Sequence, residues 1–295
     1  MTTTNLKPLA EKSGLIYTMV GFLVVLLAFV AVTFFLLTRE SRIEQEWIRL
    51  SSDLQVNSQQ LAKSATEAVD GDREAFLMLS DWANTMSEAV DSLKNGSIVR
   101  NVPALTSSTS PTLADLNDVW IRMNSNTQSI LERETLVLNL AAASNSFIGI
   151  IPEIQELTDK AIRELTRNGD STQQVFIAGR QLVLSDRVLR HLKEMLRGGS
   201  GSVAAADTLK QEIGYLEQTM QALLFGSRSV GVEQVTVPGA RDALTRAQAM
   251  YEGARPQLET ILASTSDILA VRGAADAIFT DSLAMFVLSR QVADE

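Results

Sequence analysis

The chain opens with a long apolar segment. No charged residue occurs between Ser13 and Thr38, and the stretch from Leu15 to Leu37 is almost wholly apolar. At a rise of about 1.5 Å per residue, a helix of this length spans a hydrocarbon core of roughly 30 Å. The alternative is a cleavable signal peptide, whose apolar region is shorter, about 7–15 residues, and ends in a small-x-small site. The sequence therefore predicts an uncleaved membrane helix over residues 13–38, preceded by a short tail of residues 1–12.

Beyond this segment, apolar residues recur at steps of three, four and seven, the spacing of amphipathic helices. Four stripes precede Asn168-Gly169, a pair that typically ends a helix, and the pattern then starts again. The predicted helical stretches are 43–68, 75–93, 113–131, 140–165, 171–197, 203–225, 240–264 and 266–292.

The two halves of the chain are similar to each other. Chance similarity between amphipathic helices is the alternative, but the order of long helix, short helix, Gly-Ser loop and two further helices is the same in both halves. Aligning the chain with itself places Ser58 on Ser185, Gly96-Ser97 on Gly226-Ser227, Trp120 on Tyr251, and Leu138 on Leu269. We therefore predict an all-α fold, with a membrane helix followed by two tandem four-helix-bundle modules, 39–168 and 169–295, stacked into an elongated rod.

Composition narrows the function. The 295 residues include no cysteine and one histidine, and the formal net charge is −9. These values speak against a disulfide framework, thiol catalysis, histidine-based metal sites and nucleic-acid binding, which needs a basic face. We expect no enzyme activity, no cofactor and no bound metal.

The leading helix of each half carries a related motif. Residues 50–68 read LSSDLQVNSQQLAKSATEA, and residues 178–189 read AGRQLVLSDRVL. Both resemble the leading helix of the PilJ-type sensory module, whose pattern is close to Gly-Arg-Gln-Arg-Met-Leu-Ser-Gln-Arg-Ile-Ala-Lys. The stretch 130–138, running on to 151–155, is also similar to type IV pilus methyl-accepting chemoreceptors. The resemblance covers essentially the whole chain.

A short tail before a large polar domain favours the tail in the cytoplasm and residues 39–295 outside, and long helices with a single anchor favour a homodimer. The resemblance implies a periplasmic sensor in the bacterial inner membrane. Its implied partner is the major type IV pilin, and a chemotaxis coupling protein and histidine kinase would act through a cytoplasmic part absent from this chain. Such receptors enter a second membrane span after the two modules. This sequence contains no second apolar run of that kind, so we interpret it as a truncated ectodomain with its first membrane helix.

A small-molecule sensor is the competing hypothesis, and a purely structural scaffold for a pilus or secretion machine is a third. In nitrate sensor kinases with a single such module, an arginine three residues before the motif serine reaches the anion. Gln55 and Leu182 stand at those positions here, and neither supplies a guanidinium fork. Arg180, Ser185 and Arg187 remain the candidate anion site; the alternative is that both arginines pair with acidic neighbours.

Other features have plainer interpretations. His191, between Arg190 and Lys193, is expected to be solvated. Four aromatic residues lie on apolar stripes and are expected in the core, namely Trp47, Trp82, Trp120 and Tyr251.

Two connections, 97–111 and 227–239, are longer than bundle loops usually are. The second carries alternating valines, Val230, Val232, Val235 and Val237, which would form either an extended edge for a partner strand or a cap on the bundle.

Overall fold

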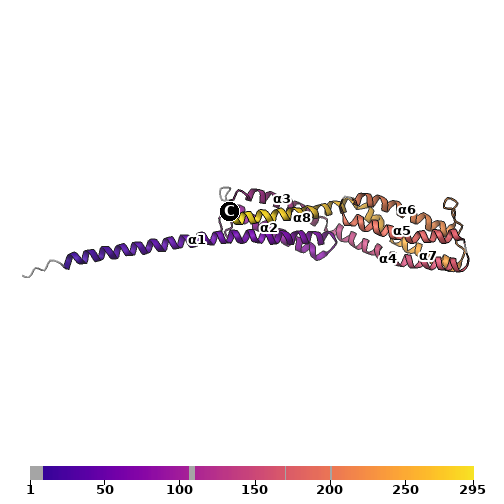
Figure 1. Ribbon diagram of the computed structural model, residues 1–295, viewed down its shortest axis with the longest axis horizontal. Helices are drawn as coiled ribbons and strands as arrows, with labels where there is room; N and C mark the ends of the chain where they lie inside the picture. Colours follow the sequence, from indigo (N-terminus) through magenta and orange to yellow (C-terminus); the bar gives the residue numbers. More distant parts are fainter. Residues whose placement is uncertain (1–8, 106–109, 170, 200) are drawn as a thin grey trace, which may run out of the picture.

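The computed structural model describes residues 9–105, 110–169, 171–199 and 201–295, apart from the side chains of residues 9–18, 36 and 37 (Figure 1). Most of the predicted tail and residues 106–109 of the first long connection lie outside these ranges. The described residues form eight α-helices. In chain order they are α1 (Leu9–Val69), α2 (Arg73–Asn95), α3 (Leu113–Leu131), α4 (Glu134–Arg167), α5 (Thr172–Arg197), α6 (Ser202–Phe225), α7 (Pro238–Ala263) and α8 (Thr265–Asp294). The predicted all-α fold is confirmed.

The helices build two bundles, one behind the other along a rod (Figure 1). The proximal bundle consists of α2, α3, α8 and the part of α1 after about residue 43, and its core runs from Leu50 to Val137 and resumes at Val271. The distal bundle consists of α4, α5, α6 and α7, with a core from Leu140 to Ile268. The first part of α1 extends from the proximal end of the rod, and the C-terminal end of α8 lies at that same end.

The helix content of the bundles differs from the expected modules 39–168 and 169–295. Helix α4, the fourth helix of the first half, packs against α5 and α7 in the distal bundle. Helix α8, the fourth helix of the second half, packs against α1 and α3 in the proximal bundle. The two halves therefore exchange their fourth helices, and the proximal bundle does not consist of consecutive helices.

The exchange follows from the links that precede α4 and α8. Between α3 and α4, the N–H of Glu132 bonds to the carbonyl of Gln128 at 2.9 Å, and that of Val137 to Arg133 at 2.9 Å. Between α7 and α8, Ser264 N–H bonds to Thr260 at 3.1 Å. These i→i−4 bonds are α-helical, so the chain continues forward with little interruption instead of turning back. A helix that continues forward leaves its own bundle and enters the next.

The two loops at opposite ends of the rod have the same internal structure. In the α2–α3 loop, Ser97 and Val102 exchange backbone hydrogen bonds of 2.8 and 3.0 Å; Ser227 and Val232 in the α6–α7 loop exchange bonds of the same lengths. Residues 105 and 235 then donate to the carbonyls of residues 93 and 223, both at 2.8 Å. These three bonds recur at the same offset in the two loops, in agreement with the predicted alignment of Gly96-Ser97 with Gly226-Ser227.

The alternating valines of the α6–α7 loop cap the distal bundle. Val232 and Val235 are buried, and Val230 and Val237 pack against the same core. The side-chain amide of Gln174 on α5 donates to the carbonyls of Glu233 and Gln234 at 3.2 and 3.1 Å. Of the two alternatives, the structure supports the cap on the bundle, because the apolar side chains face inward and two edge carbonyls are already bonded.

Among the described residues, two helices are long and apolar enough to cross a membrane, judged by length and composition. In α1 the most apolar window has a mean hydropathy of 3.0 and none of it is buried; in α4 the corresponding value is 1.4. Because α4 contributes side chains from Leu140 to Leu165 to the distal core, it is a helix of the bundle. The apolar part of α1 lies outside both bundles.

Candidate functional site

The three candidate anion-binding residues lie on α5 but do not point to one place. Ser185 is buried, and its hydroxyl donates to the carbonyl of Gln181 in the preceding turn at 2.8 Å. Arg180 is exposed. Arg187 reaches α6, where its Nε lies 2.6 Å from Oε1 of Glu212. The structure thus places Ser185 in the core, Arg180 on the surface and Arg187 against α6.

Glu212 is a buried charge that the sequence pattern does not reveal. Its side chain is only 4% exposed, and its second carboxylate oxygen lies 3.7 Å from Nε2 of His191. Nδ1 of His191 lies 3.5 Å from Glu194, and the imidazole is 18% exposed. His191 is therefore packed between α5 and α6 against carboxylates, and the expectation of a solvated histidine is wrong. The cause is Glu212, which occupies an inward position on α6 and draws both Arg187 and His191 towards it.

The aromatic residues pack as expected. Trp120 and Tyr251 are buried in the proximal and distal cores, and Trp47 and Trp82 are half-buried against the proximal core. The Tyr251 hydroxyl donates to Glu217 at 3.2 Å. Burial, and next the neighbouring Glu217 carboxylate, raise the pKa of the Tyr251 phenol above its ordinary value because both disfavour the phenolate.

The most distinctive site is the junction between the bundles, which we call the waist. It contains the α1–α2 turn at residues 70–72, the α3–α4 link, the α5–α6 turn and the α7–α8 link. Arg272 joins α8 to the ends of two other helices: its Nη1 lies 2.6 Å from Oδ1 of Asp70, just after α1, and its Nε donates to the carbonyl of Leu196 at 2.9 Å. Leu196 is in the last turn of α5, where carbonyls have no partner within the helix, so Arg272 satisfies a polar group that the helix end leaves open.

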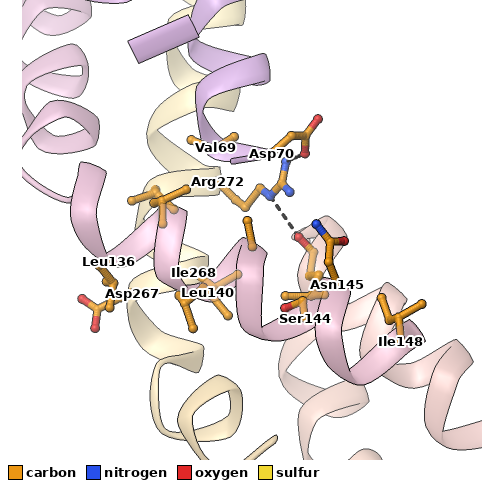
Figure 2. A pocket seen from close by; sticks show the side chains of 14 residues that line it. Val69, Asp70, Leu136, Leu140, Ser144, Asn145, Ile148, Asp267, Ile268 and Arg272 are labelled. Atoms are coloured by element: carbon orange, nitrogen blue, oxygen red, sulfur yellow. Dashed lines mark hydrogen bonds and ion pairs between the residues drawn. The ribbon is translucent and has the colours of Figure 1, made fainter. Parts of the chain in front are cut away.

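A cavity of about 120 Å³ lies beside Arg272 at the waist (Figure 2). Val69, Leu140, Ile268 and Val271 supply apolar walls, and Asp70, Ser144, Asn145 and Asp267 add polar groups. Within the described part of the chain, the buried hydroxyl of Ser144 has no hydrogen-bond partner. Sites for drug-sized ligands are larger, roughly 300 Å³ and more. The cavity therefore suits water or a small polar solute.

The waist is closely packed on one side. Gly71, in the α1–α2 turn, has a φ of +93°, and a Cβ atom at this position would overlap the side chain of Ala141 on α4. Glycine is required here by its backbone conformation and by this close approach. The end of α1 is thereby held directly against a helix of the distal bundle.

From the waist, α8 runs back along α1 through a seam of small side chains. Ser51 and Ser58 of α1 are buried, as are Ser282 and Ser289 of α8. The Gln59 amide crosses the seam and donates to the carbonyl of Ser282 at 3.3 Å. The motif of the first leading helix therefore serves to pack α1 closely against α8. Ser58 and Ser185, its counterpart in the second half, both donate to a carbonyl of their own helix.

The described residues contain no group of three or more His, Asp or Glu side chains arranged to hold a metal ion. The main structural features are the waist between the two bundles and the α1–α8 pair, which extends from the waist along the proximal bundle. The sequence motif located the leading helix of this pair, but Arg272 was not singled out. The sequence feature that could have identified Arg272 is its position as an arginine on an otherwise small and apolar stripe of the last helix.

Two curated relatives match the chain over most of its length. Protein PilJ of Pseudomonas aeruginosa is 28% identical over 282 residues, which are 96% of this chain and 41% of the relative. AlkN of Alcanivorax borkumensis, whose name assigns it to methyl-accepting chemotaxis, is 29% identical over 239 residues, which are 81% of this chain and 34% of the relative. No protein-family model matches. The resemblance to PilJ-type chemoreceptors is confirmed, and the matched part of the chain spans 41% and 34% of the length of these relatives.

Proposed function

We propose that this chain is the sensory part, with its first membrane helix, of a chemoreceptor related to PilJ. In this proposal the apolar part of α1 lies in the bacterial inner membrane and residues 39–295 lie in the periplasm. The observation that carries the proposal is the α1–α8 pair, because it connects the waist with the end of the rod from which the apolar segment extends. The protein acts by changing helix packing and not by catalysis.

The proposed signal starts in the distal bundle and passes through the waist. Helices α4 and α8 enter and leave the distal bundle there, and Arg272 joins α8 to the ends of α1 and α5. A displacement of the distal helices would therefore move α8 along or around α1. A ligand can drive this change only if it binds two arrangements of the rod with different affinity.

The proposed partner is the type IV pilin, so that the receptor reports pilus or surface contact. A coupling protein and a histidine kinase would receive the signal through a cytoplasmic region. These partners come from the resemblance to PilJ-type receptors and are supported by the elongated shape, which places the distal bundle far from the apolar segment.

The proposal is tested by following the α1–α8 pair while pilin is added. Because the chain contains no cysteine, the variant Gln59→Cys/Ser282→Cys carries a unique pair of thiols across the seam. We expect soluble pilin from the same organism to bind the chain in detergent micelles saturably and to change the rate of disulfide formation. Absence of binding would contradict pilin as the partner, whereas saturable binding with an unchanged rate would contradict the signal path.

We also propose that the receptor is a homodimer that pairs through α8. Phe279, Leu283, Phe286 and Val287 follow helical spacing on one face of α8 and are 42–55% exposed. The corresponding positions of α4 in the first half are Ile148, Pro152, Gln155 and Glu156, so the apolar face is specific to α8. Leu283→Cys is expected to form a disulfide between copies, and Lys210→Cys, exposed on α6 in the distal bundle, serves as the control.

Sensing of a small molecule remains the second candidate function, and the waist cavity favours it over the surface of α5. Arg272, Asn145 and the unpartnered Ser144 hydroxyl supply polar groups there. Arg180, Ser185 and Arg187 stay a hypothesis that a screen of anions against the Arg180→Ala and Arg187→Ala variants would test. A solute acting at the waist would instead lose its stabilising effect on the chain in Ser144→Ala.

A further inference from the structure

The α2–α3 loop carries two fully exposed apolar residues. Ile98 is 100% exposed and Val99 is 97% exposed, and they occupy the tip between the bonded residues Ser97 and Val102. Single exposed apolar side chains are common on protein surfaces, but two adjacent ones at the tip of an ordered turn need a reason.

The second copy of the loop supplies a control within the same chain. The α6–α7 loop shares the paired bonds between residues 227 and 232 and the bond from residue 235 to residue 223, and Arg228 and Ser229 stand where the first copy has Ile98 and Val99. The loop structure therefore does not require an apolar tip. The difference between the copies must come from their surroundings.

The surroundings differ because only the first loop lies near the apolar segment of α1. Residues 100–102 and eight α1 residues between Phe35 and Arg49 line a common groove of about 750 Å³. Arg100 contacts Glu46 at 3.2 Å, eight residues, or about 12 Å, beyond Thr38. Because the loop continues past the end of α2, its tip projects towards the apolar segment. The polar headgroup layer adds roughly 5–8 Å to each side of the hydrocarbon core, so a tip that reaches a few ångströms beyond Arg100 towards the apolar segment enters this layer.

Other residues around the first loop have the character of a membrane interface. The Trp47 indole donates to the carbonyl of Pro103 at 3.1 Å. In the second copy, Gln174 donates in the same way to the carbonyl of Glu233. Tryptophan is typical of the membrane–water boundary. Arg39, Arg42 and Arg49 line the groove behind the tip, where cationic side chains face lipid phosphates favourably.

We propose that Ile98 and Val99 insert into the outer surface of the membrane that holds α1. The α2–α3 loop is then a second point of membrane contact, placed on the helix that returns from the waist. This second contact restricts tilting and rotation of the proximal bundle relative to the lipid. A displacement of α8 then occurs relative to a bundle whose orientation is fixed. This inference depends on the apolar segment of α1 being in the membrane, and it does not depend on pilin.

A fluorescence experiment on the full chain tests the contact. The chain is placed in vesicles of phosphatidylethanolamine and phosphatidylglycerol, and a polarity-sensitive label is attached at Val99→Cys or at its counterpart Ser229→Cys. We expect blue-shifted emission, and quenching by nitroxide-bearing lipid, at position 99 and neither effect at position 229. Adding Ile98→Arg, the residue type found in the second copy, should remove most of the quenching at 99.

A third label at Phe29→Cys, in the apolar segment, distinguishes failure of the proposed loop contact from failure of the proposed membrane anchor. If position 29 is quenched while positions 99 and 229 behave alike, the loop contact is wrong and the membrane anchor stands. If position 29 is not quenched, the anchor and the loop contact are both wrong.

Discussion

At the scale of single residues, Gly71 determines how closely the two bundles approach. Its φ of +93° lies in the region that favours glycine, and α4 fills the space where a side chain would begin. A substitution there disturbs the turn and the neighbouring helix together, whereas an added Cβ at Gly169 or Gly199 would meet open space.

We expect Gly71→Ala to destabilise the chain by about 2 kcal/mol or more, because the left-handed backbone alone costs an L-residue about 1–2 kcal/mol and the overlap with Ala141 adds to it. Thermal unfolding of the full chain in detergent micelles measures the effect. Gly169→Ala is the matched control, since its φ is +68° but nothing lies within 4 Å of the added Cβ. Equal losses in the two variants would show that the contact with α4 contributes nothing.

Arg187 is expected to stabilise the distal bundle. Arg187→Ala removes the 2.6 Å contact from the buried Glu212 carboxylate and should cost about 1–3 kcal/mol, less than a fully buried pair because Arg187 is half-exposed. Arg180→Ala, exposed on the same helix, should change stability by less than about 0.5 kcal/mol in the same denaturation assay. In a Glu212→Leu background the cost of Arg187→Ala should largely disappear, and its persistence would contradict a role through Glu212.

At the scale of helices, the pairing of α1 with α8 depends on small side chains. Serines at buried positions let the two backbones approach, and the hydroxyls of Ser58 and Ser282 are short enough to bond within their own helices. The stability of the α1–α8 contact should therefore depend more on the volume of these side chains than on their polarity.

Ser282→Leu should destabilise the chain by about 1–3 kcal/mol, because Ser282 is fully buried and the added methyl groups would push α8 away from α1. The melting temperature, with Ser282→Ala as the matched control, separates volume from the lost hydroxyl. A leucine variant as stable as the alanine variant would mean that the seam has room to spare.

The sequence predicts most of the helices but not which of them pack together. Apolar stripes and stops such as Asn95-Gly96 and Asn168-Gly169 mark most helix ends to within a few residues, because burial and capping act locally. The exceptions are α4, which begins six residues before the predicted 140, and α1, which joins the predicted helices 13–38 and 43–68 into one. An apolar stripe indicates which face of a helix is buried, but it does not indicate which other helix packs against that face. The exchange of α4 and α8 had a local signal in the lack of glycine or proline at residues 131–134 and 263–265, where the chain does not turn.

The candidate site was less predictable for the same reason. Arg272 and Asp70 belong to opposite ends of the sequence, and only the return of α8 to the proximal bundle brings their side chains to 2.6 Å. Likewise, Glu212 looks like one of many carboxylates on a polar helix until α5 is placed against it. Ser58 and Ser185 could be singled out from the sequence because the motif that contains them lies within one helix, as do the carbonyl groups to which they donate.

At the scale of the whole molecule, the waist decides how stiffly the two bundles are joined. Arg272→Ala removes the contacts with Asp70 and with the carbonyl of Leu196, so we expect a wider range of angles between the bundles. Spin labels at Lys63→Cys in α1 and Lys210→Cys in α6 would report a broader distance distribution. Arg290→Ala, an exposed arginine of α8, is the control. Identical distributions for both variants would show that Arg272 does not stiffen the waist.

The exchange of the fourth helices also sets an order of events during synthesis. The distal bundle is built from the continuous segment 134–263, whereas the proximal bundle needs α1, α2 and α3 together with α8, which emerges last. Bringing α8 back to α1 closes the longest loop in the chain, a step that is favoured once the distal bundle has already shortened the path between them. Pulsed hydrogen exchange during refolding should therefore protect the amides of α4–α7 before those of α1 and α8. Simultaneous protection of all these helices would contradict this order.

While the last helix is missing, α1 exposes the surface that α8 covers in the complete fold, and α1, α2 and α3 form an incomplete bundle. Such a chain is vulnerable to proteases and to pairing with a second nascent copy until the 30 residues of α8 arrive. Completion of the proximal bundle therefore depends on a single late event, the docking of α8, and a chain that has completed it has its two bundles connected through the waist.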